Sequence, residues 1–228
     1  MYKTWIMAAV CAALVFPVLA QKKEDDRLAN STKVLEELLS SDKGLPKSIV
    51  DKSLCILIFP SVKKIAVGIG GSYGRGVLVC RKGEDMKGEW GAPAMYKLDE
   101  GSLGVQLGST ATDFVLAVVT QKGAQQILNG KTKLGANAAA AAGPTGAQAT
   151  SYNAEAMNVD VLTYSRSKGL FAGVSLAGAS MESDDDANKA LYNKVISASH
   201  IVAGLQTEVP ASGKPLVELL DKTSPART

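Results

Sequence analysis

The chain has 228 residues and a formal net charge of +3, and 46% of its residues are hydrophobic while only 5% are aromatic. This length suits one domain with a real core, and the apolar content excludes a disordered chain. The small net charge gives no argument for nucleic-acid binding, so we expect no nucleic-acid partner. The 22 glycines favour a compact β-rich domain with tight turns.

The first twenty residues, MYKTWIMAAVCAALVFPVLA, have the pattern of a signal peptide. Lys3 precedes an apolar run that is short for a membrane span and that ends in VLA, which fits a signal-peptidase site. We therefore predict a signal peptide over 1–20 and a single domain over 21–228. The protein is expected to be exported, either periplasmic or secreted, and peripheral to the membrane. An uncleaved anchor is the alternative.

Two helices are predicted before the first strand. Between Asp25 and Leu39, leucines and a valine recur at spacings of three, four and seven, with charges between them. A short helix is expected from Pro46 to Lys52, because proline is favoured in a first turn. The apolar run LCILIFP then suits a strand that ends at Pro60.

Two cysteines follow the predicted signal peptide, Cys55 and Cys80, each in a short apolar run. If their strands are neighbours, the two thiols can form a disulfide in an oxidising compartment. The alternative is two buried thiols that are not bonded. No Cys or His spacing is typical of zinc, so we expect no metal site.

The stretch VGIGGSYGRGVLVC looks at first like a phosphate-binding loop. A dinucleotide fingerprint needs a third glycine where this chain has Tyr73, and it needs a helix afterwards. A Walker loop needs Lys followed by Ser or Thr, whereas this chain has Arg75 and Gly76. We therefore expect two strands here, with glycines that let them bend, bulge or admit another backbone.

Further short, β-branched runs follow around residues 89–120 and 158–183, with a short helix predicted from Lys122 to Leu128. The alanine-rich segment before Pro144 is interpreted as small-residue backbone packed against a neighbour. Asp184–Asp186 are expected to cap one helix that runs on to about residue 204, and a last helix is expected over 214–220. The predicted fold is a single α+β domain: a glycine-rich, mainly antiparallel sheet or barrel-like core with flanking N- and C-terminal helices.

Catalytic patterns are scarce in this sequence. His200 is the only histidine, so any hydrolase triad would have to use it. A single histidine on a predicted apolar helix face is more often structural, and no convincing pair of catalytic carboxylates is present. We expect no enzymatic activity and no cofactor, with a hydrolase built around His200 as the alternative.

Cations gather where the predicted strands end or turn. If several meet, they form a basic rim for phosphate headgroups, each contributing on the order of 1 kcal/mol near an anionic membrane. Apolar side chains beside such cations favour peripheral membrane binding. The alternative is that the arginines pair with acids such as Asp160 or Glu89 and that the phenylalanine belongs to the core. The candidate lipid-binding residues are Arg75, Arg166, Lys168, Phe171, Lys63 and Lys64, and Arg81 is a further strand-end cation.

Four ordered motifs together resemble the SYLF domain, a lipid-binding family also called the yeast-type actin-binding or Las-seventeen-binding domain. They are IFPSVKKIAVGIGGSYGRGVLVCR, EWGAPAMYKLDEGSLGVQLGS, KLGANAAAAAGPTG and YSRSKGLFAGVSLAGA. The resemblance covers about residues 28–220. It implies a non-enzymatic module that binds phospholipids, some of whose fungal members also bind actin, and the export signal here suggests a bacterial-type member.

The leading functional hypothesis is an exported, non-enzymatic protein that binds anionic phospholipid at a basic and apolar rim. The alternative is an envelope scaffold or partner-binding protein, similar to an actin regulator, without lipid specificity. Such a protein would engage another protein or form a homo-oligomer.

Overall fold

The computed structural model describes residues 2–65, 71–100, 111–145, 158–167, 169–204 and 207–227, with side chains described for 20–63, for 73–99 and in the later ranges. Six α-helices lie in these ranges: α1 Tyr2–Ser40, α2 Lys47–Lys52, α3 Gln121–Leu128, α4 Asp185–Tyr192, α5 Ala198–Val202 and α6 Lys214–Thr223. A 3₁₀ turn, η2, covers Ala211–Gly213.

One sheet organises the molecule. Its strands are β1 Cys55–Ile65, β2 Gly71–Cys80, β3 Ala94–Glu100, β4 Thr112–Val118, β5 Thr132–Lys133, β6 Ala140–Ala142, β7 Val161–Ser167, β8 Leu170–Gly173 and β9 Ser180–Ser183. Their order is β5-β9-β3-β2-β1-β4-β7-β6, with β8 also paired to β7. The pairs are antiparallel except β6 with β7, which are parallel. The predicted fold class, a single α+β domain around a mainly antiparallel sheet, is confirmed.

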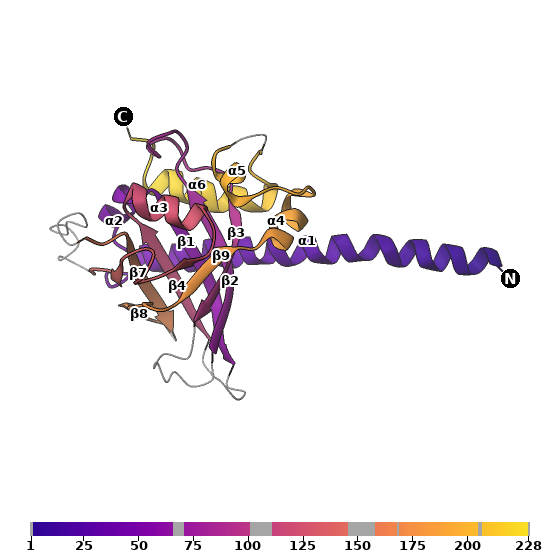
Figure 1. The fold of residues 1–228 in the computed structure, drawn as a ribbon, viewed down its shortest axis with the longest axis horizontal. Helices are drawn as coiled ribbons and strands as arrows, with labels where there is room; N and C mark the ends of the chain where they lie inside the picture. The colour runs from indigo at the N-terminus through magenta and orange to yellow at the C-terminus, as the bar shows by residue number, and fades with distance from the viewer. Residues whose placement is uncertain are drawn as a thin grey trace.

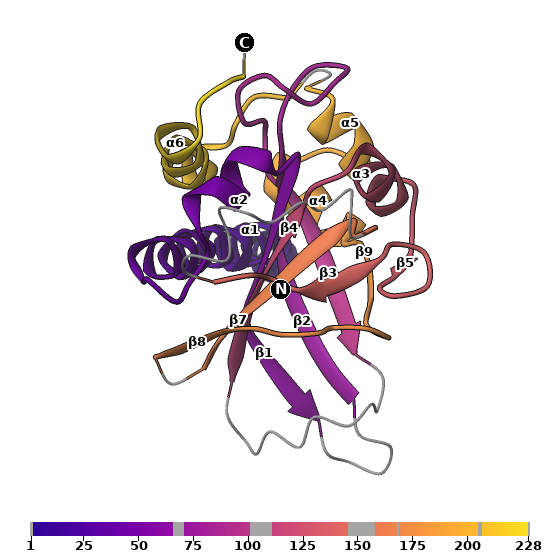
Figure 2. The ribbon, with the colours of Figure 1, turned by 90° about the vertical axis from the view of Figure 1, so that its left-hand side faces the viewer.

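Helices cover both faces of this curled sheet (Figures 1 and 2). On one face, apolar residues of α1, α2, α4 and α6 pack against alternate residues of the central strands. On the other face, α3 and α5 pack against the residues between them. Because both faces are covered, the middle segments of β1, β2 and β4 are continuous apolar runs, and every residue of β4 is buried.

The first helix is longer than predicted. The periodic segment from Asp25 to Leu39 forms the second half of α1, and the helix extends back to Tyr2. Figure 1 shows the N-terminal part of α1 extending away from the sheet. Among the described residues, no helix has both the length and the apolarity needed to cross a membrane.

Residues 71–80 of the glycine stretch form β2, which confirms the prediction of a strand for this part, while residues 67–70 lie outside the described residues. β1 carries an irregularity between Ile58 and Lys63, where its register with β2 shifts. A Cβ on Gly76 would lie 2.1 Å from the Ile58 carbonyl oxygen, and one on Gly74 would lie 2.6 Å from Val62 Cγ2. These two glycines therefore let the bulged strand approach β2 closely, the steric role expected from the sequence.

Two segments near the C-terminus test the helix predictions. Asp184 caps α4 by accepting a hydrogen bond from the Ala187 N–H, so the capping role expected of this acidic segment is confirmed for Asp184. The prediction of one continuous helix beyond it is wrong, because Asn193 adopts a left-handed conformation with φ of 56°. The Ser197 side chain then caps a separate helix, α5.

The alanine-rich segment contains β6 rather than a helix. A Cβ on Gly143 would lie 2.1 Å from the Tyr164 ring, and one on Gly173 would lie 2.2 Å from the Gly143 carbonyl oxygen. The expected close packing of small-residue backbone against a neighbour is thus confirmed at Gly143.

Candidate functional site

The β7–β8 hairpin presents an exposed apolar tip at the edge of the sheet. Gly169 has a φ of 75°, which favours glycine and allows the tight turn between the two strands. Leu170, the next residue, has 77% of its surface exposed. Its neighbour Phe171 points to the other face of the hairpin, where it is half-buried against the core. Among the described residues, the other exposed large hydrophobic side chain is Val195, which lies between α4 and α5.

Arg166 lies opposite Phe171, one cross-strand pair back from the pair of Ser167 and Leu170, and is held by two carboxylates. Its Nε and Nη2 atoms are each 2.7 Å from Asp113 Oδ2, and its Nη1 contacts Glu37 of α1. The other oxygen of Asp113 accepts a hydrogen bond of 2.8 Å from the Ser61 N–H, inside the β1 bulge. Arg166 thus connects β7, β4 and α1. The alternative of an ion-paired arginine describes this residue, although the acids differ from those anticipated.

The two acids that the sequence suggested have other partners. Asp160 accepts hydrogen bonds from the Thr120 hydroxyl and, at 2.9 Å, from the Ala139 N–H, and so joins the start of α3 to the segment before β6. Glu89 lies 3.8 Å from the Lys82 Nζ on the surface.

Arg75 lies on β2 beside a second group of charges. Its Nε donates a 2.6 Å hydrogen bond to the Tyr73 hydroxyl and lies 3.4 Å from Asp184 Oδ2. The hydrogen bond to Tyr73 is the main reason that the pKa of Arg75 is raised. The pKa of Arg27 on α1 is lowered mainly by burial and secondarily by the nearby charge of Arg75. The Arg75 side chain remains 44% exposed.

The other predicted rim residues are only partly described. Lys63 is exposed on β1, directly opposite Tyr73 of β2. The side chain of Lys64 and the whole of Lys168 lie outside the described residues.

The sheet separates the two candidate arginines. Arg166 is on β7, where it lies opposite Asp113 of β4, and Arg75 is on β2. Strands β1 and β4 therefore lie between the two arginines. Three strand spacings correspond to about 14 Å. The sheet therefore brings Lys63 near Arg75 but does not bring Arg75 to the hairpin tip.

Arg81, the further strand-end cation, is a core residue and does not belong to a rim. It is 1% exposed, and its guanidinium lies over the Trp90 ring, 4.4 Å from the centroid. It donates hydrogen bonds to the carbonyl oxygens of Ser53, Gly88, Ser224 and Pro225. Sequence reasoning missed this role because the acceptors are backbone atoms, and three of the four are far away in the chain.

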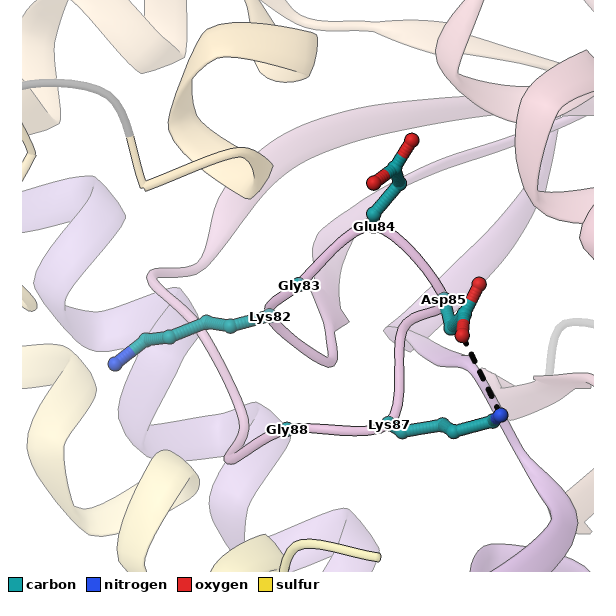
Figure 3. A pocket seen from close by; sticks show the side chains of 6 residues that line it. All are labelled: Lys82, Gly83, Glu84, Asp85, Lys87 and Gly88. Atoms are coloured by element: carbon teal, nitrogen blue, oxygen red, sulfur yellow. Dashed lines mark hydrogen bonds and ion pairs between the residues drawn. The ribbon is translucent and has the colours of Figure 1, made fainter.

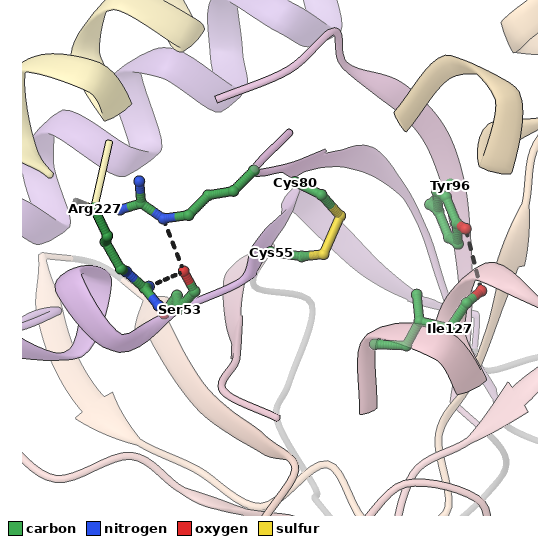
Figure 4. The surroundings of a disulfide bond; sticks show 7 residues. Ser53, Cys55, Cys80, Tyr96, Ile127 and Arg227 are labelled. Atoms are coloured by element: carbon green, nitrogen blue, oxygen red, sulfur yellow. Dashed lines mark hydrogen bonds between the residues drawn. A yellow bond between two sulfur atoms is a disulfide. The ribbon is translucent and has the colours of Figure 1, made fainter. Parts of the chain in front are cut away.

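Cys55 and Cys80 are opposite each other on β1 and β2, and the structure places a disulfide between them (Figure 4). Their Cα atoms are 3.9 Å apart and both residues are buried. Of the two alternatives left open by the sequence, the structure has the bonded pair. Near the disulfide, Arg227 donates a 2.6 Å hydrogen bond to the Ser53 carbonyl oxygen.

No catalytic constellation or metal site emerges from the described side chains. His200 is exposed, and its Nδ1 lies 2.6 Å from the Ser197 hydroxyl at the start of α5. A shallow pocket lies over the loop before Trp90 and is lined by Lys82, Gly83, Glu84, Asp85, Lys87 and Gly88 (Figure 3). It mixes both signs of charge. Within the described part of the chain, no three His, Cys, Asp or Glu side chains are placed to hold a metal ion.

The sequence matches a known protein family. Residues 99–223 match the family profile described as Ysc84, Las17-binding protein actin regulator. The chain is 32% identical over 188 residues to an SH3 domain-containing protein of Schizosaccharomyces pombe, which covers 81% of this chain and 43% of that protein.

Two further relatives carry the family name. Protein YSC84 of Saccharomyces cerevisiae is 29% identical over 188 residues, 81% of this chain and 39% of that protein. The human SH3 domain-containing YSC84-like protein 1 is 29% identical over 204 residues, 88% of this chain and 58% of that protein. The chain thus spans between about two-fifths and three-fifths of the length of these relatives.

Proposed function

Because the chain belongs to the Ysc84 family of Las17-binding actin regulators, we propose that it is a non-enzymatic binding module whose ligand is an anionic phospholipid surface. The names of the relatives described above mention an SH3 domain or Ysc84, and none of them names a catalysed reaction. Lipid is the ligand that the geometry of the β7–β8 hairpin favours best.

One observation carries this proposal: Leu170, with 77% of its surface exposed, projects from a tight hairpin. Burying a leucine side chain in an apolar medium gains roughly 1.5–3 kcal/mol, which an exposed tip can obtain from the acyl region of a membrane. Lys168 precedes it in the sequence, and a cation beside an apolar tip suits an anionic headgroup layer, whereas Arg166 is paired with Asp113 and Glu37.

Export is the second part of the proposal. The N-terminal apolar segment predicts a signal peptide, and a disulfide between Cys55 and Cys80 is the kind of bond that persists in an oxidising compartment. The protein would then bind the non-cytoplasmic side of the membrane as a peripheral protein.

Co-sedimentation with vesicles tests the lipid part, and the chain provides a matched control. We expect the protein to pellet with phosphatidylglycerol-rich vesicles more than with neutral ones, and Leu170→Ser to reduce this pelleting. Val195→Ser removes another highly exposed apolar side chain elsewhere, at 86% exposure, and should pellet like the unmodified protein. Equal losses in both variants would reject the hairpin as the lipid site, and no pelleting with any vesicle would reject the lipid function.

A protein partner is the second candidate function. It is favoured by the description of the family as Las17-binding and by the name LAS seventeen-binding protein 3 of another yeast relative. In this case the chain would be a scaffold whose oligomeric state or partner binding does not depend on lipid. Sedimentation velocity with and without vesicles separates the two candidates, because a stable oligomer indifferent to lipid favours the scaffold.

A further inference from the structure

The guanidinium of Arg166 is the described cation nearest in sequence to the exposed tip, yet both of its bonding edges are occupied. Its Nε–Nη2 edge is bound to Asp113 and its Nη1 contacts Glu37. With one positive and two negative charges, this group is formally negative. As it stands, it would repel an anionic headgroup rather than attract one.

We propose that Glu37 is an exchangeable latch, and that a phosphate anion displaces it from the Nη1 side of Arg166. This inference rests on the proposed function and gives a phosphate-binding site to the base of the hairpin. A guanidinium matches the geometry of phosphate oxygens and binds them with charge-assisted hydrogen bonds. A phosphate at this position would therefore replace one anionic partner of Arg166 by another.

Glu37, rather than Asp113, is the partner that can leave. The Glu37 side chain is 40% exposed, whereas that of Asp113 is 11% exposed. Asp113 binds Arg166 through two nitrogens and also accepts the Ser61 N–H, so its removal would leave buried polar groups without partners. Glu37 can exchange its partner for water at little cost, because surface ion pairs contribute little net stability.

Opening the latch leaves the fold intact. Helix α1 is held on the sheet by apolar residues that do not depend on Glu37, since Leu28, Leu35 and Leu38 are all fully buried. Asp113 would keep Arg166 oriented toward the hairpin. The expected change is local, with a side chain of α1 moving away from the guanidinium.

The test compares two neighbouring acids of α1 in the full chain. Glu37→Gln removes the latch, and Glu36→Gln makes the same change of net charge at an exposed position. Binding to phosphatidylglycerol vesicles should tighten about fivefold in Glu37→Gln and much less in Glu36→Gln. Both variants should melt at the temperature of the unmodified protein. Adding Arg166→Gln to Glu37→Gln should abolish this gain in vesicle binding. If that double variant does not fold, Arg166→Lys in the Glu37→Gln background takes its place.

Inorganic phosphate separates two sources of the anion. Titration of each variant with phosphate alone, followed by the NMR signal of the Arg166 Nε–H, shows whether free phosphate suffices. A response specific to Glu37→Gln with phosphate alone supports the site with free phosphate as ligand, and one seen only with vesicles supports the lipid headgroup.

Equal behaviour of Glu36→Gln and Glu37→Gln in both titrations would overturn the latch. If the unmodified protein binds vesicles through Leu170 while the two variants do not differ, the proposed function stands without it. If no vesicle binding occurs at all, the proposed function fails and the phosphate titration still decides the latch.

Discussion

At the scale of single residues, Arg81 shows how a buried charge is accommodated without a bonded carboxylate. Its Nε, Nη1 and Nη2 atoms donate hydrogen bonds to four carbonyl oxygens and to the Ser224 hydroxyl. These five bonds use all the donors that a guanidinium has. Burial, and secondarily the charge of Arg227, lower the pKa of Arg81 to about 10. Arg81 therefore joins the start of β1, the loop before Trp90 and the end of α6.

We predict that Arg81→Lys destabilises the protein by roughly 2–4 kcal/mol, because an ammonium has three donors and cannot satisfy the five acceptors of a buried guanidinium. Urea unfolding followed by circular dichroism measures this loss as a lower midpoint. Lys82→Gln, at a side chain that is 47% exposed, is the control and should change the free energy of unfolding by less than about 0.5 kcal/mol. Equal midpoints for the two variants would contradict the role given to Arg81.

Asn188 is a second buried polar residue with a structural task. It is fully buried, its Oδ1 accepts a 2.7 Å hydrogen bond from the Met95 N–H, and its Nδ2 donates to the Met95 carbonyl oxygen at 3.2 Å. The side-chain amide thus makes the two hydrogen bonds with the Met95 backbone that a neighbouring strand would make with β3. Asn188→Ala should cost about 2–3 kcal/mol in unfolding free energy, since the Met95 N–H loses its acceptor. Lys189→Ala, on the exposed side of α4, should leave the unfolding curve unchanged; a similar loss there would refute the assignment.

At the scale of elements, the pairing of β1 with β2 depends on two glycines that differ in what they contact. A Cβ at Gly76 meets backbone of β1, 2.1 Å from the Ile58 carbonyl oxygen, whereas one at Gly74 meets the Val62 side chain. Backbone cannot give way, so Gly76→Ala should prevent folding or cost more than about 3 kcal/mol, and Gly74→Ala should cost less. Thermal melts of the two variants test this order. Val62→Ala should partly rescue Gly74→Ala and not Gly76→Ala, and rescue of both would contradict the contacts described.

The same pair of strands is cross-linked by Cys55 and Cys80, which are 25 residues apart in the chain. Closing a loop of this size should stabilise the folded state by about 3 kcal/mol relative to the reduced protein. We expect the melting temperature to fall on addition of dithiothreitol, and Cys55→Ser with Cys80→Ser to melt like the reduced protein. The form that begins at Gln21 should show no reactive thiol when unfolded without reductant. Two equivalents of thiol in that assay would exclude the bond.

At the scale of the whole molecule, the sequence predicted what depends on local pattern. Apolar runs indicated the central strands, the periodic segment before Ser40 indicated a helix, and Asp184 indicated a cap, all of which the structure contains. Those signals need only the neighbouring residues.

The remaining features depend on contacts between distant segments. Arg166 and Asp113 are 53 residues apart, and Arg81 and Ser224 are 143 apart, so no local spacing could reveal these partners. The exposure of Leu170 and the half-buried position of Phe171 depend on which face of the hairpin each residue takes. For the same reason, the sequence could name candidate cations for the site but could not say which of them were already paired.

The N-terminal segment is separable from the folded domain in the pattern of burial along α1. Gln21, Lys22 and Lys23 are exposed, and burial along the second half of α1 begins at Glu24 and continues at Leu28. A chain cut after Ala20 would therefore retain these buried side chains. Its new helix start would also carry Glu24, Asp25 and Asp26 close to the positive end of the helix dipole, where negative charge is favourable.

We expect residues 21–228 to fold and to melt cooperatively, whereas residues 31–228, which lack Leu28, should melt at a clearly lower temperature. Removing a fully buried leucine alone costs about 2–5 kcal/mol, which corresponds to a fall of several degrees in a protein of this size. Calorimetry of the two truncated forms measures the difference. Mass spectrometry of the protein recovered from the periplasm of an expressing bacterium should show an N-terminus at Gln21. Loss of the cooperative transition in 21–228 would place residues 1–20 within the folded domain, and recovery of an uncut chain would contradict the predicted cleavage.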